Sequence, residues 1–192
     1  GRVEPVEREL MPDAGKSPLL QRDSTALVVV DIQEKFAPPI LEAGRWQSLL
    51  KNVIILARAA QILDLPVIVT EQYPQGLGKT APELREVLEG RPRVEKVHFG
   101  AHHADAFRDE LAASKATQVL LTGIEAHICV LQTGLGLLAA GFDVHVAADA
   151  VCSRAASNID VALNLLAASG ATITSTETAV FALLEKSGTP EF

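Results

Sequence analysis

A short apolar run that ends in an aspartate, Ala26-Leu27-Val28-Val29-Val30-Asp31, lies near the start of the chain. Its length and its β-branched residues are typical of a strand that is buried on both faces, as in a parallel sheet. Five further runs of this kind follow, at residues 66–70, 94–97, 118–122, 143–147 and 171–174. Together the runs predict a six-stranded parallel sheet.

Longer amphipathic segments separate the predicted strands, which is the pattern of repeated βα units. The clearest is residues 45–63, where apolar residues recur every three or four positions. We predict further helices at 81–88, 104–113, 129–140, 158–169 and 176–186, and loops at 36–44 and 72–80. With right-handed crossovers, this order predicts a three-layer α/β/α Rossmann-like fold, whose site lies beyond the carboxyl ends of the strands.

The composition is that of a folded globular chain, because 48% of its 192 residues are hydrophobic and 21% are charged. The formal net charge of -7 disfavours binding to nucleic acid or to an anionic membrane. No apolar run in the sequence is long enough to span a bilayer. We expect an N-terminal tail at residues 1–24 and one domain at residues 25–192.

The chain has two cysteines, Cys129 and Cys152, too few for the disulfide framework of a small secreted domain. This count favours a reducing compartment, and the first two dozen residues contain no apolar core of a signal peptide. We therefore expect a cytoplasmic protein.

Three chemically active residues fall at the carboxyl ends of predicted strands: Asp31, Lys96 and Cys129. Each has a structural alternative: Asp31 is equally compatible with capping a turn, Lys96 with an exposed edge position, and Cys129 with an inert core thiol. Their combination favours chemistry, because a carboxylate can accept a thiol proton while an ammonium holds the ion pair together. We expect a helix N-terminus and the ammonium to stabilise the Cys129 thiolate and lower its pKa.

Three segments carry a resemblance to a known family: VVVDIQEKF at 28–36, EKV at 95–97 and GIEAHICV at 123–130. In this order they resemble the isochorismatase-like cysteine hydrolases. The resemblance extends from about residue 25 to near the C-terminus. Two further segments, TEQYPQGLG at 70–78 and ADAVCSR at 148–154, resemble the isochorismatase domain-containing branch of that family.

The resemblance implies a catalytic triad in which Asp31 is the general base, Lys96 its ion-pair partner and Cys129 the nucleophile. It also implies an oxyanion hole made by the backbone amides of Glu125 and Cys129, next to a cis peptide bond between Ile124 and Glu125. The implied fold is the same six-stranded Rossmann-like sheet. The implied activity is hydrolysis of a small amide, ureide or ester-like substrate, most simply at a C–N bond.

One departure from the family concerns metal binding. Nicotinamidases of this family carry an Asp-x-His metal site after the second strand, whereas this chain has Glu71-Gln72-Tyr73. We therefore expect neither nicotinamidase activity nor a metal or other cofactor. Isochorismatases that cleave a vinyl ether use no catalytic cysteine, so Cys129 also points away from that reaction.

Several residues on loops and strand ends are candidates to shape a substrate pocket: Gln33, Phe36, Gln72, Tyr73, His98 and His127. Packing roles are equally compatible with the loop residues, and both histidines fit a surface or core position. The spacing of His98, His102, His103 and His127 matches no common metal-ligand pattern.

Two alternatives to an enzyme remain open at this point. The chain is also compatible with an oligomeric scaffold that keeps the hydrolase fold without turnover. A thiol sensor that uses Cys129 and Cys152 requires the two residues to approach within disulfide distance. Because the resembling proteins usually self-associate, we expect a homo-oligomer with a small-molecule substrate.

Overall fold

A computed structural model describes residues 17–42 and 44–192, and its centre is one parallel sheet. The strands are β1 (Thr25–Val30), β2 (Val67–Gln72), β3 (Arg93–Lys96), β4 (Gln118–Ile124), β5 (Asp143–Cys152) and β6 (Thr172–Thr174). Their order across the sheet is β3-β2-β1-β4-β5-β6, and every neighbouring pair is parallel. The predicted six-stranded α/β/α fold is confirmed.

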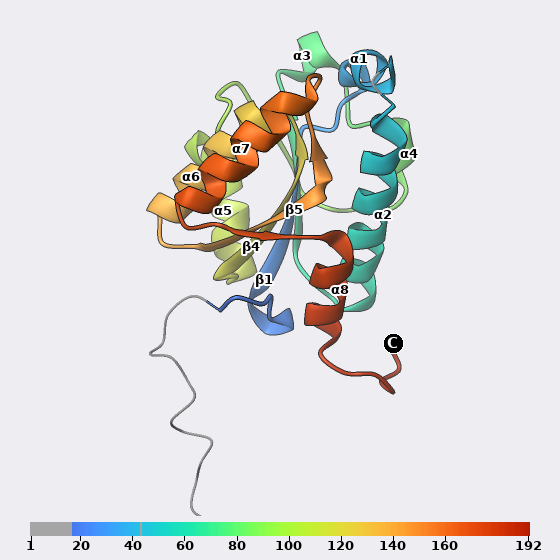
Figure 1. Cartoon of the computed structure of the whole chain (residues 1–192), viewed down its shortest axis with the longest axis vertical. Coiled ribbons are helices and arrows are strands. Elements are labelled where there is room, and N and C mark those ends of the chain that lie inside the picture. Colours follow the sequence, from blue (N-terminus) through green and yellow to red (C-terminus); the bar gives the residue numbers. More distant parts are fainter. Residues whose placement is uncertain (1–16, 43) are drawn as a thin grey trace, which may run out of the picture.

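Helices cover both faces of this sheet (Figure 1). On one face lie α1 (Ala37–Glu42), α2 (Trp46–Ile62), α4 (Pro82–Arg85) and α8 (Thr176–Leu184), and on the other lie α5 (Asp105–Ser114), α6 (Leu131–Ala139) and α7 (Ala156–Ala168). The short α3 (Pro74–Leu77) follows β2 at the carboxyl end of the sheet. The longest predicted helix is thus confirmed to within one residue at each end.

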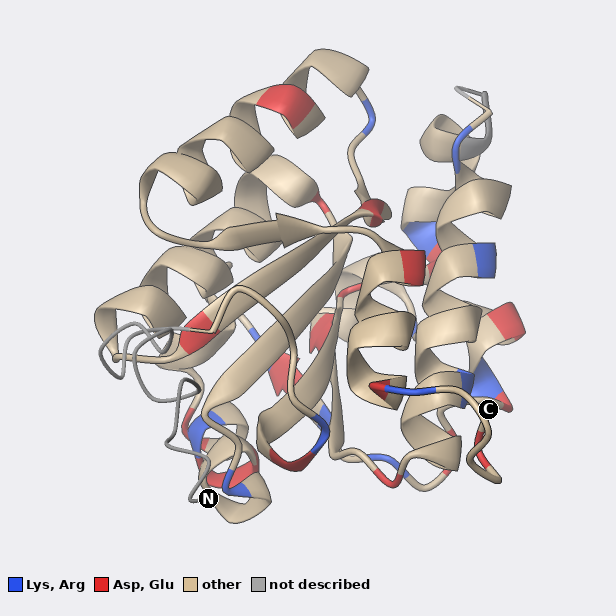
Figure 2. Cartoon of the chain, turned by 60° about the horizontal axis from the view of Figure 1, so that its bottom comes forward, with Lys and Arg blue, Asp and Glu red and all other residues tan. Residues whose placement is uncertain are grey.

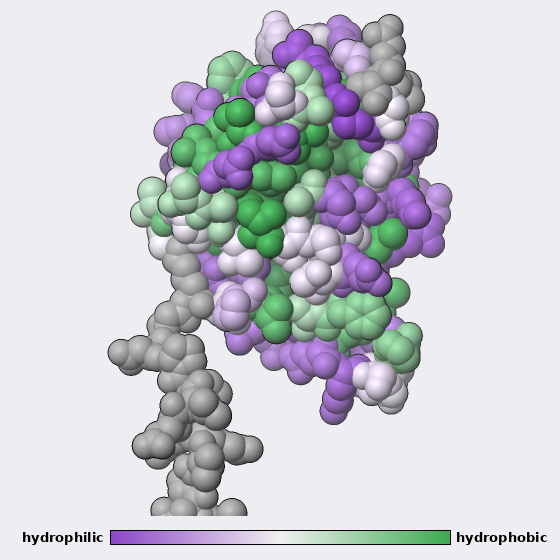
Figure 3. Space-filling view, in the orientation of Figure 1, coloured by the Kyte–Doolittle hydropathy of each residue, from purple (hydrophilic) through white to green (hydrophobic). Residues whose placement is uncertain are grey.

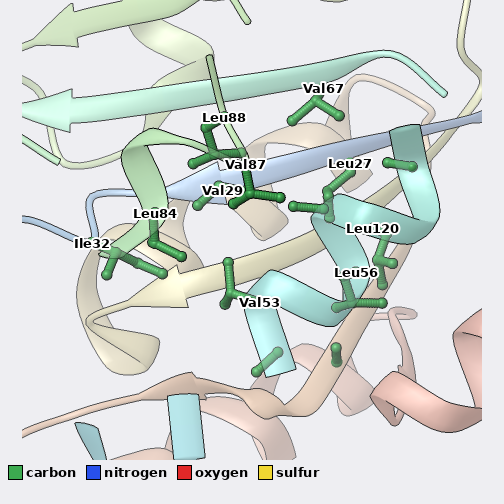
Figure 4. Packing of buried hydrophobic residues seen from close by; sticks show 14 of the residues in the cluster. Leu27, Val29, Ile32, Val53, Leu56, Val67, Leu84, Val87, Leu88 and Leu120 are labelled. Carbon is green, nitrogen blue, oxygen red and sulfur yellow. The ribbon is translucent and has the colours of Figure 1, made fainter. Parts of the chain in front are cut away.

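Alternation along β1 creates two hydrophobic cores, because successive side chains of a strand point to opposite faces. Leu27 and Val29 pack in the cluster that contains Val53 and Leu56 of α2 (Figure 4). Val28 and Val30 pack in the other cluster, with side chains of α5, α6 and α7. A strand buried in this way on both faces carries Asp31 to the edge of the core.

The structure corrects both predicted loops. Residues 36–44 contain α1, and residues 72–80 contain α3 as well as the last residue of β2. Proline normally interrupts a helix, but Pro38 and Pro39 lie in the first turn of α1, where a missing N–H removes no intrahelical bond. Strand β5 also runs five residues beyond its prediction, past a register shift in its pairing with β4.

The predicted tail divides into two parts. Its first 16 residues lie outside the described residues. Residues 17–24 pack against the amino end of the sheet, where Leu20 is buried and the Gln21 amide donates to Gln118 Oε1 at 2.7 Å. Among the helices that the structure describes, none has the length and apolar character to cross a membrane.

Candidate active site

Asp31 follows β1 directly and is fully buried. Its backbone has a φ of 49°, in the left-handed region that aspartate enters more readily than most residues. Asp31 Oδ1 accepts a hydrogen bond of 2.7 Å from Thr70 Oγ1, and the Asp31 amide donates to the Thr70 carbonyl at 3.1 Å. The neighbouring strand β2 therefore holds this carboxylate in one orientation.

Gly123 permits the close approach of β4 to this point. It is paired with Val30 in the sheet, and its φ is 118°. A Cβ atom at residue 123 would lie 2.0 Å from the Val30 carbonyl oxygen, so any other side chain would push β4 away from the residue that precedes Asp31.

Lys96 is the last residue of the edge strand β3, yet its side chain is buried. Its Nζ donates to Asp31 Oδ2 at 2.8 Å, to Gln72 Oε1 at 2.7 Å, and to the carbonyls of Phe99 at 2.9 Å and His98 at 3.2 Å. Four acceptors surround an ammonium that has three hydrogens, so its charge is fully solvated by the protein. The alternative of an exposed edge lysine is wrong.

Cys129 lies in a π-helical turn, Ala126–Val130, that leads into α6, and it is 5% exposed. The expected low thiol pKa is wrong. Burial, followed by the charge of Asp31, raises the pKa of the Cys129 thiol to about 12, although Lys96 acts in the opposite direction. Desolvation and a nearby carboxylate both penalise a thiolate, and here they outweigh the ammonium. The resting site therefore holds a protonated thiol, with Asp31 and Lys96 close enough to act on it.

The second cysteine lies elsewhere. Cys152, at the end of β5, is also buried and free, but it packs in the α2 cluster, whereas Cys129 packs in the cluster of α5, α6 and α7. The sheet thus separates the two side chains, and this arrangement gives a disulfide sensor no support.

The peptide bond between Ile124 and Glu125 is cis, as the family resemblance implied. Glu125 follows β4 and is buried, and its carbonyl accepts hydrogen bonds from the amides of Ile128 at 3.1 Å and Val130 at 3.2 Å. Its side chain was not anticipated as a participant. Glu125 Oε2 accepts from the amide of Arg154 at 2.9 Å and from Arg154 Nε at 3.0 Å.

Three of the predicted pocket residues, Gln33, Gln72 and Phe36, use their side chains to hold neighbouring parts of the protein in place. Gln33 Nε2 donates to the carbonyls of Gln72 and Gly78, and its Oε1 accepts from the Gln72 amide. Gln72 uses its own side chain on Lys96 and on the Val97 carbonyl. Phe36 packs against the hydrophobic core of the α2 face.

Tyr73 and His98 line a surface cavity of about 350 Å³ together with Lys96, beside β3. Neither Asp31 nor Cys129 lines this cavity, so the cavity lies beside the cluster of Asp31, Lys96 and Cys129 and does not contain it. His127 does not line this cavity. Its Nδ1 lies 2.9 Å from Ser153 Oγ, and its Nε2 lies 3.3 Å from Asn158 Nδ2.

Residues at the place of the nicotinamidase metal site are already engaged. Glu71 Oε1 accepts from the amide and hydroxyl of Thr80, and Arg93 lies 3.7 Å away. Within residues 17–42 and 44–192, no group of three His, Cys, Asp or Glu side chains could hold a metal ion. His98, His102 and His103 do gather, and burial followed by the charge of His103 lowers the pKa of His102.

Thr70 is the neighbour of Asp31 that residue-by-residue reasoning missed. The available signal was its position: a polar residue at the end of the strand predicted at 66–70, which the structure pairs with Val30 of β1. The contact between Glu125 and Arg154 had no such local signal, because 29 positions separate the two residues.

Comparison with known proteins identifies the family of this chain. A family model for the isochorismatase domain matches residues 25–178. The chain is 39% identical over 173 residues to a secreted isochorismatase effector of Phytophthora sojae, covering 88% of this chain and 81% of that protein.

Solved structures show the same fold. MAR1 ribonuclease from Caenorhabditis elegans superposes with a TM-score of 0.82 at 39% identity, covering 91% of this chain and 88% of that one. YcaC from Escherichia coli, an octameric hydrolase of unknown specificity, gives a TM-score of 0.79 at 22% identity, covering 92% and 85%. From its matched residues, its fold and its relatives, the chain belongs to the isochorismatase domain family.

Proposed function

We propose that the protein is a cysteine hydrolase of a small amide, ureide or ester-like substrate, most simply at a C–N bond. The observation that carries this proposal is one buried cluster in which Asp31, paired with Lys96, lies beside the thiol of Cys129. A carboxylate that is held in place beside a neutral thiol is suited to general-base activation of a nucleophile.

The first half of the reaction forms a covalent adduct. Asp31 accepts the proton of Cys129 Sγ as the sulfur bonds to the substrate carbonyl carbon. Once Asp31 is neutral, its contribution to the high thiol pKa disappears, while the ammonium of Lys96 remains to stabilise the anion. The protonated Asp31 then donates its proton to the leaving nitrogen or oxygen, and a thioester remains on Cys129.

The backbone amides of Glu125 and Cys129 stabilise the oxyanion of each tetrahedral intermediate. The hydrogen bonds of the described residues include none that the Glu125 amide donates, which leaves this N–H available to a substrate. In the second half Asp31 accepts a proton from water, the hydroxide attacks the thioester, and Cys129 Sγ leaves and regains its proton from Asp31. Lys96 holds the Asp31 carboxylate in place throughout, because its Nζ donates to protein acceptors.

The test is a panel of small carboxamides, ureides and p-nitrophenyl esters, with Cys129→Ala and its matched control Cys152→Ala. We expect turnover that Cys152→Ala retains and Cys129→Ala loses, and an acyl adduct on the peptide that contains Cys129. Activity that survives Cys129→Ala would contradict the mechanism. The absence of turnover and of any adduct would favour the scaffold alternative.

An RNA oligonucleotide belongs in the same panel, because one relative is described as a ribonuclease. The net charge of -7 disfavours this substrate, and in the view of Figure 2 the Lys and Arg positions form no continuous basic face. Cleavage of RNA that depends on Cys129 would replace the proposed substrate class.

We also infer that the protein is cytoplasmic and self-associates, and that it needs no metal. Two groups of exposed apolar side chains support association: Tyr73, Val97 and Phe99 beside the edge strand β3, and Val161, Leu165 and Ile173 on α7 and β6. Figure 3 shows hydrophobic surface on the side of the molecule where α7 lies. Exposed apolar groups of this kind favour burial against another chain. Light scattering coupled to size-exclusion chromatography tests association, and a monomeric mass would contradict it.

A further inference from the structure

The buried carboxylate of Glu125 has no part in the proposed chemistry, yet it belongs to the residue whose amide the proposed mechanism assigns to the oxyanion. Glu125 is 3% exposed, and a buried carboxylate needs hydrogen-bond donors to offset the loss of water. Arg154 supplies two such hydrogen bonds, because its backbone amide and its Nε both donate to Glu125 Oε2. This contact ties the cis-peptide turn to the loop between β5 and α7.

Arg154 presents an unusual combination of exposure and fixed geometry. Its side chain is 59% exposed, while that of its partner Glu125 is 3% exposed. Hydrogen bonding to Glu125, with the negative charge of that group, raises the pKa of Arg154. The Nε of its planar guanidinium and its backbone amide donate to the same carboxylate oxygen. These two hydrogen bonds fix the direction of the Glu125 carboxylate.

The same loop holds the turn at a second point. Ser153 Oγ lies 2.9 Å from His127 Nδ1, and Asn158 Nδ2 lies 3.3 Å from His127 Nε2. The imidazole of His127 is therefore engaged on both sides by the loop and the start of α7.

Arg45, beside the start of α2, anchors the loop in turn. Its Nη2 donates to the carbonyls of Ser153 at 2.9 Å and Arg154 at 2.5 Å. A continuous set of contacts thus runs from α2 through residues 153–154 to the residue next to the cis peptide. None of these side chains contacts Asp31, Lys96 or Cys129 through the hydrogen bonds that the structure describes.

We propose that Arg154 is a positioning residue that acts through Glu125 to aim the backbone amide of Glu125 at the oxyanion. This inference rests on the proposed hydrolase function. It assigns Arg154 no contact with the reacting atoms, and it predicts a defect confined to steps in which a carbonyl oxygen becomes negative. A donor misplaced by about 1 Å is expected to lower the rate by about 100-fold.

The experiment compares two reactions of the same thiol. Acylation by p-nitrophenyl acetate forms an oxyanion, whereas alkylation by iodoacetamide displaces iodide from carbon and forms none. Both rates are measured at Cys129, identified by peptide mass, for the wild type, Arg154→Ala and Arg154→Lys. The matched control is Arg22→Ala, because Arg22 also pairs with a glutamate, Glu191 at 3.2 Å, but near the amino end of the sheet.

We expect Arg154→Ala to acylate about 100-fold more slowly than the wild type, with an unchanged rate of alkylation. Arg154→Lys keeps a cation for Glu125 and should recover part of the loss, and Arg22→Ala should match the wild type in both reactions. Equal acylation by Arg154→Ala and wild type overturns the inference, as does a parallel loss of acylation and alkylation. Failure of the wild type to acylate at Cys129 at all overturns the proposed function instead.

Discussion

The two ends of the sheet each bury an acidic side chain beside a basic one, but they do so differently. At the carboxyl end, both oxygens of Asp31 accept hydrogen bonds, and Lys96 is surrounded by acceptors. At the amino end, Asp143 Oδ2 accepts from Gln118 Nε2 at 2.9 Å, whereas Asp143 Oδ1 has no partner among the described residues.

His145 completes the contrast. Its Nε2 lies 3.3 Å from Asp143 Oδ2, within ion-pair distance, yet the angles do not make a hydrogen bond and the nitrogen is unpartnered in the described part of the chain. This contact is weak, because a hydrogen bond weakens steeply when misaligned. The amino-end pair is therefore the looser of the two.

The comparison teaches that burial of an acidic side chain beside a basic one does not by itself identify a reactive site. The amino-end group anchors residues 17–24, since Gln118 also donates to the Leu19 carbonyl. The carboxyl-end group is held by several hydrogen bonds and adjoins the thiol of Cys129, a combination that favours a reactive site.

Replacement of the base should have the largest effect. We expect Asp31→Asn to lower turnover by about 10²- to 10⁴-fold, the usual contribution of a general base. The same change should speed alkylation of Cys129 at neutral pH, because Asp31 raises the pKa of that thiol and Lys96 lowers it. Asp143→Asn should change neither rate, and a similar loss of turnover in Asp143→Asn would erase the distinction between the two ends.

Removal of the cation should mainly reduce stability. Lys96→Met leaves Asp31 buried without its ionic partner, and we expect the free energy of unfolding to fall by about 3 to 5 kcal/mol. Asp143→Asn retains an acceptor for Gln118 and should cost about 1 kcal/mol. Urea denaturation measures both, and equal losses would show that the tight and loose pairs contribute alike.

A single hydroxyl at each end permits a finer comparison. Thr70→Val removes a hydrogen bond to the Asp31 carboxylate, worth about 1.5 to 3 kcal/mol, and should lower turnover by about 10- to 100-fold. Thr25 Oγ1 donates to the Gln21 carbonyl at 2.7 Å and to Gln118 Oε1, so Thr25→Val should cost stability without loss of turnover. If Thr70→Val keeps full activity, the orientation of Asp31 does not depend on this bond.

The smallest effect concerns alkaline pH. The pKa of Cys129 rises from an ordinary value of 9.0 to about 12 on folding. Below pH 9 the thiol is protonated in both states, but above it only the unfolded chain loses the proton, so stability falls as pH rises. Between pH 9 and 10 the wild type should lose about 1 kcal/mol relative to Cys129→Ala. Parallel denaturation curves for the two proteins would contradict the high thiol pKa.

Much of the architecture was predictable from local patterns. Buried parallel strands are short apolar runs and their crossovers are amphipathic, so strand positions and fold class followed from periodicity alone. The same reasoning placed Asp31 and Lys96 at the carboxyl ends of strands and Cys129 after one. It failed at α1 and α3, where proline marked a first helical turn instead of a loop.

The sequence by itself determined the six strands, their covering helices and which chemically active residues share one edge of the sheet, because these depend on periodicities of a few residues. Only the tertiary structure decided that the Cys129 thiol rests protonated, that Gln33 and Gln72 support the site, and that Arg154 holds Glu125. These properties depend on desolvation and on contacts between distant segments, and neither is encoded in the spacing of residues along the chain.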